Sequence, residues 1–148
     1  QRDHAGSVKL HYLQGVSNQE VPLWINAANV ILLTSAHEGS PTVVKEALAC
    51  NVAVVSVDVG DVAERIAGID GCYLSSGDPL DLSEKLRLVR TGPARVNGRE
   101  RMRPLSLPSI AAQLQSLYHW VLSSNSFAES GRAKKPGFSD QTASSLPH

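Results

Sequence analysis

Two glutamates, Glu38 and Glu46, stand with seven residues between them around the expected start of a helix. A carboxylate accepts hydrogen bonds from paired sugar hydroxyls. Two carboxylates at this spacing therefore suit two sugars, such as the ribose of a nucleotide and a hexose. Acidic residues are also favoured at a helix start by the helix dipole, without any ligand. From the spacing alone, two solvated glutamates are the default interpretation.

The segment between the glutamates predicts an anion site. Ser40 is a suitable N-cap and Pro41 a suitable first helical residue, while Gly39 lets the backbone approach a ligand closely. The free N–H groups of the first turn, those of Thr42 and Val43 among them, point back toward the loop. Together with the positive end of the helix dipole, these groups favour a diphosphate.

Alternating strands and helices are expected to position this segment. Short apolar runs predict buried strands, and amphipathic stretches between them predict helices. This alternation is typical of βαβ units and a parallel sheet, in which ligands bind beyond the carboxyl ends of the strands. The expected strands are 8–13 (half-buried, by its period of two), 30–33, 52–57 and 72–74. The expected helices are 21–27, 41–50, 61–67, 78–89 and 109–122. Asp61 with Glu64 forms a capping-box-like start, Asp78 with Pro79 starts the fourth helix, and Ser109 caps the last.

Composition excludes several classes of protein. The 148 residues carry no net formal charge, with 14 Lys and Arg against 14 Asp and Glu, so a nucleic-acid-binding module with a basic face is not expected. The longest apolar runs are far shorter than the ~20 residues of a membrane helix. Two cysteines are too few for a disulfide scaffold. The histidines are scattered and no D-x-D pair occurs, so no metal site is expected.

The C-terminal third is less patterned. Segment 91–108 is basic and contains Gly and Pro; we expect its arginines to form a solvated face, with an anionic membrane surface as the alternative. Segment 125–148 is rich in Ser, Gly, Lys and Pro without apolar periodicity, which predicts a disordered tail. The folded part is therefore expected over residues 1–124.

The run from Glu38 to Asn51 resembles the E-x7-E signature of the retaining glycosyltransferases of family 4, which have the GT-B architecture. Further segments are similar to that family in the same order along the chain. The likeness covers roughly residues 8–122. Several similar segments in the same order are a more specific signal than one short motif. The similar segments are 12–16, 27–35, 54–60 and 71–74, with Asp78 after the last.

The resemblance implies a role for each residue of the segment. Glu38 would be the catalytic group that contacts the transferred sugar, and Glu46 would bind the ribose. Val16 would lie against the nucleobase. The donor would be a nucleoside-diphosphate sugar. Its sugar would be transferred with retention of the anomeric configuration, without a metal or another cofactor. The sugar and phosphates would be bound by Gly39, Ser40, Pro41, Thr42 and Val43.

The resemblance also implies missing parts. The fold expected is an incomplete Rossmann-like GT-B C-terminal domain, because that family's domain has a strand, a helix and a strand before the region of Val8. An Arg and a Lys at the first junction, and an N-terminal domain that binds a glycan or lipid-linked acceptor, would also be absent. We therefore expect the chain alone to be inactive and cytoplasmic, with the inner face of the membrane as an option. Segment 8–13 should be frayed, displaced or paired with 30–33.

Two other functions are compatible with the same residues. One is a non-catalytic nucleotide-binding or interaction domain that has this fold without the chemistry. The other is a nucleotide-sugar epimerase, which can share the architecture. Binding of a nucleoside diphosphate, and the fate of a labelled sugar donor, would separate these alternatives from transfer.

Overall fold

A computed structural model describes the backbone of residues 9–125 and the side chains of residues 9–123. The chain divides into two compact units, Gln1–Met102 and Arg103–His148, which are treated separately below. The tail predicted at 125–148 falls almost wholly outside the described residues. In the described part, no helix combines the length and the apolar character that a membrane crossing requires.

The first unit is built on a parallel sheet, which confirms the predicted α/β fold. Its three strands are β1 (Val30–Leu33), β2 (Ala53–Val57) and β3 (Tyr73–Ser75), in the order β1-β2-β3. Val30 pairs with Ala53, and Val55 pairs with Tyr73. The carboxyl ends of these strands therefore meet at one edge of the sheet, where the segment after Leu33 begins.

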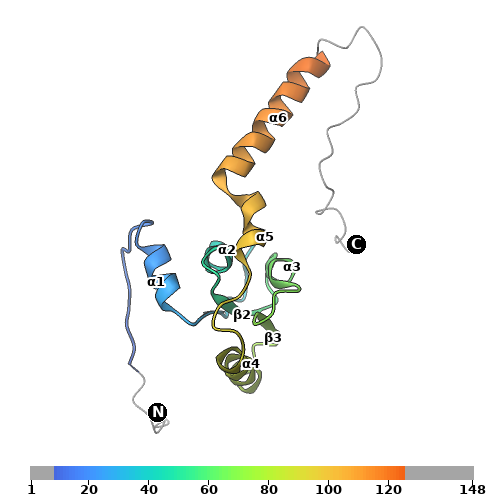
Figure 1. Ribbon diagram of the computed structural model, residues 1–148. Helices are drawn as coiled ribbons and strands as arrows, with labels where there is room; N and C mark the ends of the chain where they lie inside the picture. Colours follow the sequence, from blue (N-terminus) through green and yellow to red (C-terminus); the bar gives the residue numbers. More distant parts are fainter. Residues whose placement is uncertain (1–8, 126–148) are drawn as a thin grey trace. The chain divides into compact units, whose positions relative to one another are not determined.

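Helices cover both faces of the sheet, as Figure 1 shows with α2 and α3 on one side and α4 on the other. The central strand β2 is consequently almost completely buried. This double cover explains why β2 is a continuous β-branched run and not an alternating one. The helices of this unit are α1 (Val21–Ala27), α2 (Thr42–Ala49), α3 (Val62–Ile66), α4 (Pro79–Thr91) and α5 (Arg99–Met102).

Helix α2 contributes the centre of the core. Val44, Ala47 and Leu48 are each at most 1% exposed, and their i, i+3, i+4 spacing places them on one helical face. The helix packs against β1, β2 and α5. This packing fixes the position of α2, whose first turn directly follows the loop at the carboxyl edge of the sheet.

The strand predicted at 8–13 is not formed by residues 9–13, while Val8 lies outside the described residues. The side chains of Leu10, Tyr12 and Leu13 are exposed. A period-two pattern stabilises a strand only where a neighbouring strand supplies hydrogen bonds and one face is buried. Of the outcomes expected for this segment, pairing with 30–33 does not occur at residues 9–13, and the expectation of a half-buried strand is wrong there.

Three arginines of segment 91–108 bind backbone carbonyl groups, contrary to the simple solvated face expected. Arg95 donates to the carbonyl oxygens of Asn26 and Ala28 at the end of α1. Arg99 donates to Ala49 at the end of α2, and Arg101 to Ala67 at the end of α3. Each guanidinium thus satisfies a carbonyl at a helix C-terminus, where positive charge is favoured by the dipole.

The same segment is also anchored through its backbone. Val96 N–H donates to the carbonyl oxygen of Asn51, and Arg99 N–H donates to the side-chain oxygen of Asn51. Val96 and Met102 are buried. The segment from Arg95 to Met102, which we call the arginine belt, therefore belongs to the packed structure of the first unit.

The second unit contains a short 3-10 helix, η1 (Arg103–Leu105), and a long helix, α6 (Leu107–Asn125). The last helix was expected to begin after an N-cap at Ser109. It begins at Leu107, two residues before Ser109, and the hydroxyl of Ser109 donates to the carbonyl oxygen of Arg103. Ile110, Leu114 and Leu117 still share one face, as their spacing predicts.

Two aspartates organise the turn from β3 into α4. Asp78, at the predicted start of this helix, is its N-cap and accepts hydrogen bonds from the N–H groups of Leu80 and Asp81. The carboxylate of Asp81 accepts from Ser76 N (2.7 Å) and from Ser75 Oγ (2.8 Å). The hydrogen bond from the backbone of Ser76, followed by that from Ser75, lowers the pKa of Asp81 to about 2.

We expect an acid-dependent loss of stability from Asp81. Its pKa in the folded state lies below the unfolded value of about 3.9, so its contribution is present above that value and is lost as the pH falls toward 2. In Asp81→Asn, the urea midpoint at neutral pH should be lower and its decline with acid shallower. Urea titrations over a pH series test this, with Asp70→Asn, at an exposed position, as control. Parallel pH profiles for Asp81→Asn and the wild type would contradict it.

Candidate functional site

Two loops meet at the carboxyl edge of the sheet. The first, 34–41, joins β1 to α2 and carries Glu38. The second, 58–61, joins β2 to α3. Since β1 and β2 are parallel neighbours, both loops emerge on the same side, which is where open α/β sheets bind ligands.

The two loops are in direct backbone contact at Gly60. A Cβ atom on Gly60 would lie 2.3 Å from the carbonyl oxygen of Gly39 and 2.9 Å from that of Glu38. The φ angle of Gly60 is +57°, a left-handed conformation that glycine adopts without steric cost. Residue 60 must therefore be glycine for the second loop to approach the first this closely.

A chain of polar side chains joins the same loops. Lys45 Nζ donates to Ser40 Oγ at 2.7 Å, and Ser40 Oγ donates to Asp61 Oδ2 at 2.7 Å. The same Asp61 oxygen accepts from Arg65 Nε at 2.8 Å. We call these four residues the loop network. Its two cations flank one carboxylate and one hydroxyl, so each of the three hydrogen bonds ends on an oxygen acceptor.

The charges of the loop network alter the ionisation of Asp61. Burial acts to raise the pKa of this carboxyl, but the hydrogen bonds from Ser40 and Arg65 and the charges of Arg65 and Lys45 outweigh it. The pKa of Asp61 is lowered as a result. At neutral pH the carboxylate is thus the charged acceptor that the loop network needs.

These contacts correct two predicted helix caps. The N-cap of α2 is Pro41, not Ser40, and no side chain caps the helix. Asp61 is the N-cap residue of α3, but its carboxylate makes no cap hydrogen bond there. Both side chains had been predicted to serve their own helices, whereas the structure pairs them with each other across the two loops.

The predicted site residues lie at different depths. Glu38 and Gly39 are exposed on the first loop, Glu46 is half-buried on α2, and Pro41 is buried. Thr42 and Val43 occupy the first two positions of α2, so their N–H groups belong to the unpaired donors of the first turn. The structure therefore brings residues 38–46 together as one segment.

Val16 is half-buried in the connection before α1. Nothing in the described structure links it to residues 38–46, and its predicted contact with a nucleobase stays a prediction. Among residues 9–125, no group of three or more His, Cys, Asp or Glu side chains is arranged to hold a metal ion. Cys50 and Cys72 are free thiols.

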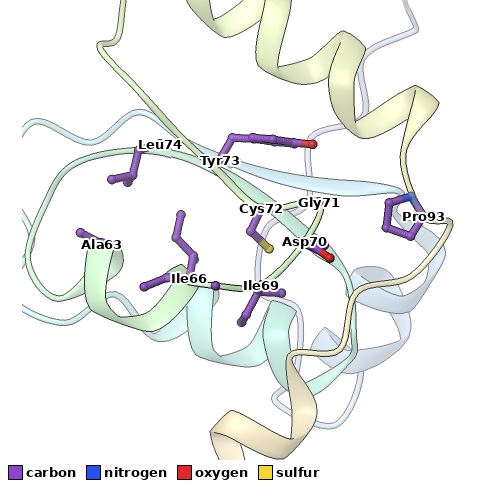
Figure 2. A pocket seen from close by; sticks show the side chains of 11 residues that line it. Ala63, Ile66, Ile69, Asp70, Gly71, Cys72, Tyr73, Leu74 and Pro93 are labelled. Carbon is purple, nitrogen blue, oxygen red and sulfur yellow. The ribbon is translucent and has the colours of Figure 1, made fainter.

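A separate pocket of about 610 Å³ lies along α3 and β3 and includes no residue of the first loop. Figure 2 shows Ala63 and Ile66 on its helical side and Leu74 on the strand. Burial raises the pKa of the Cys72 thiol at this pocket, which keeps the sulfur in its unreactive neutral form. The lining is largely apolar and offers no group suited to a diphosphate.

Comparison with known proteins agrees with the resemblance of the loop. Over 72 residues, 48% of this chain and 12% of the relative, the sequence is 33% identical to a Vi polysaccharide biosynthesis protein (VipC/TviE) of Salmonella typhi. Over 78 residues, 52% of this chain and 19% of the relative, it is 32% identical to D-inositol 3-phosphate glycosyltransferase 1 of Catenulispora acidiphila.

The matched segment thus spans less than a fifth of either relative. No solved structure matches the chain. Residues 2–90 match the sequence profile of a family described as glycosyl transferases group 1, and this match includes both loops and all of the loop network. The chain belongs to the glycosyl transferases group 1 family.

Proposed function

We propose that residues 38–46 bind the nucleoside-diphosphate sugar of a retaining glycosyltransferase. The observation that carries the proposal is the position of the Glu38–Glu46 segment at the carboxyl edge of the sheet, in a chain of this family. Glu46 accepts hydrogen bonds from the ribose hydroxyls, and Glu38 faces the transferred sugar. Gly39, Ser40, Pro41, Thr42 and Val43 form the backbone of the sugar and phosphate site, and Val16 lies against the base.

The exposed and half-buried carboxylates suit these two roles. Glu38 stands on an exposed loop, where a sugar and an acceptor have access. Glu46 lies one turn after Thr42 on α2, so a diphosphate at the first turn would place a ribose within its reach. Transfer to a glycan or lipid-linked acceptor is proposed for the whole protein, because no residue of this chain is assigned to the acceptor.

Substitution of Glu46 tests the ribose assignment. Hydrogen bonds to a charged acceptor contribute about 1.5–3 kcal/mol, so Glu46→Gln is expected to weaken nucleotide binding about 10- to 100-fold. Isothermal titration with UDP, GDP and ADP gives the wild-type preference, and the variant is then titrated with the preferred nucleotide.

Glu84→Gln is the matched control, because Glu84 is an exposed glutamate on α4, across the sheet from α2. Its affinity should equal that of the wild type. An affinity of Glu46→Gln within twofold of the wild type would refute the ribose role. A wild-type chain that binds none of the three nucleotides would refute the proposed function itself.

A further inference from the structure

Asp61 and Arg65 belong to none of the segments that the resemblance or the proposed function assigns to the donor. Asp61 is nevertheless the one carboxylate that the described structure shows bonded to the loop carrying Glu38. Its partner Ser40 stands two residues after Glu38 and directly before Pro41, the N-cap of α2. A side chain that holds Ser40 therefore acts on both the sugar-facing carboxylate and the start of the helix.

We propose that Asp61 is a positioning residue of the donor site, which fixes the turn 38–41 through the hydroxyl of Ser40. This role rests on the proposed function, since it concerns the loop to which the donor is assigned. Asp61 does not touch the donor itself. It determines how the turn is presented to the donor.

The carboxylate of Asp61 is itself held in place by Arg65 and by its position on α3. Arg65 Nε donates to the same oxygen that accepts from Ser40, at 2.8 and 2.7 Å. Arg65 and Asp61 lie one turn apart at the start of α3, and their side chains are only about a quarter or less exposed (24% and 20%). The carboxylate is thus held on α3, which packs against β2, and the loop is tied to the core through it.

The hydrogen bond between Ser40 and Asp61 matters because the turn 38–41 makes few other contacts. The side chains of Glu38 and Ser40 are exposed, and Gly39 has no neighbour within 4 Å of a built Cβ. The backbone contact with Gly60 limits the turn from one side only. The hydrogen bond from Ser40 to Asp61 supplies the directional restraint that the contact lacks.

Lys45 is bonded to the same hydroxyl group of Ser40. Its ammonium donates to the Ser40 hydroxyl, which turns the hydroxyl hydrogen toward Asp61 and polarises the chain of hydrogen bonds. This contact also keeps a positive charge beside the first turn of α2. Loss of the Asp61 charge would release both the turn and the position of Lys45.

The test compares Asp61→Asn, Ser40→Ala and the double variant in the 148-residue chain. Asp61→Asn keeps the shape and an acceptor oxygen but removes the charge. Ser40→Ala removes the hydroxyl of an exposed side chain. Glu64→Gln is the matched control, because Glu64 also pairs with Arg65, at 3.3 Å, while the hydrogen bonds of Ser40 go to Asp61 and Lys45.

The first measurement is amide hydrogen exchange of residues 34–44 without ligand. Each single variant should raise the exchange rate of this segment about threefold or more, with β2 unchanged, and Glu64→Gln should leave it unaltered. This measurement is independent of nucleotide. Exchange equal to the wild type in both Asp61→Asn and Ser40→Ala overturns the positioning role, even if their unfolding midpoints fall.

The second measurement is the affinity for whichever of UDP, GDP and ADP the wild type binds. Each single variant should bind about 3- to 10-fold more weakly, and the double variant no more weakly than the weaker single one, because both substitutions break the same connection. If the affinity loss of the double variant equals the product of the two single losses, the two side chains act independently. That result would overturn the proposal that Asp61 acts through Ser40. If the wild type binds none of them, the proposed function fails, and hydrogen exchange still decides whether Asp61 positions the turn.

Discussion

Replacing Gly60 by alanine is expected to lower the free energy of unfolding by about 2–4 kcal/mol. Part of the cost is the left-handed backbone of this residue, at φ +57°. The rest comes from the added Cβ, which would lie 2.3 Å from the carbonyl oxygen of Gly39 and force one loop away from the other. Urea denaturation followed by circular dichroism measures the change.

Two further glycines separate these causes. Gly15 has φ +65° with open space around it, so Gly15→Ala carries backbone strain without a clash. Gly39 has open space and no left-handed φ, so Gly39→Ala should be nearly neutral for stability. The order of unfolding midpoints should be Gly39→Ala, then Gly15→Ala, then Gly60→Ala as the lowest. A Gly60→Ala midpoint equal to that of Gly15→Ala would show that the loops do not need their close contact.

Replacing Gly98 by alanine is expected to cost about 1–3 kcal/mol through overpacking. Its Cβ would lie 2.8 Å from the carbonyl oxygen of Leu48 and 2.9 Å from its Cα and Cβ atoms. Leu48 is completely buried in α2, so it has no space into which to move. The arginine belt must shift instead, which would stretch the hydrogen bonds of Arg99 to Asn51 and Ala49.

The control for Gly98→Ala is Asn97→Ala, at the exposed neighbouring position. Both variants are compared with the wild type by urea denaturation. The midpoint should fall for Gly98→Ala and stay within about 0.5 kcal/mol of the wild type for Asn97→Ala. Equal unfolding midpoints for the three proteins would mean that close packing of Gly98 against Leu48 of α2 is not required for stability.

The strands and helices of the first unit were largely predictable, because local patterns determine them. Continuous apolar runs gave β1 and β2, and Asp78 with Pro79 gave the start of α4. The parallel arrangement followed from alternation of elements. Residues 9–13 do not form the predicted strand. An alternating pattern indicates only a propensity for strand structure, because strand formation also requires a neighbouring strand to pair with.

The loop network was not predictable from local signals. Ser40 and Asp61 each fit the pattern of a helix cap, and the structure uses both side chains for a contact between residues 21 positions apart. Only the Asp61–Arg65 pair, with its i, i+4 spacing, gave a sequence signal. The register of β1 on β2 brings the two loops together, so the contact is a product of the sheet.

The arginine belt shows the same limit. Charged residues without apolar periodicity are typical of a solvated face, and these arginines are indeed exposed. Their guanidinium groups nevertheless donate to carbonyl oxygens at the ends of α1, α2 and α3. The acceptors are backbone atoms, which leave no mark in the sequence, so the pairing could be found only from the structure.

The strand order also affects how the sheet can form. Each strand pairs with the one that precedes it in the chain, and the paired residues Val30 and Ala53, or Val55 and Tyr73, enclose loops of only about twenty residues. Such short closures carry a modest entropic cost compared with longer connections. During synthesis, β1 and β2 can therefore dock with α2 before the arginine belt leaves the ribosome. The belt, which carries α5, then forms its hydrogen bonds to the ends of α1, α2 and α3.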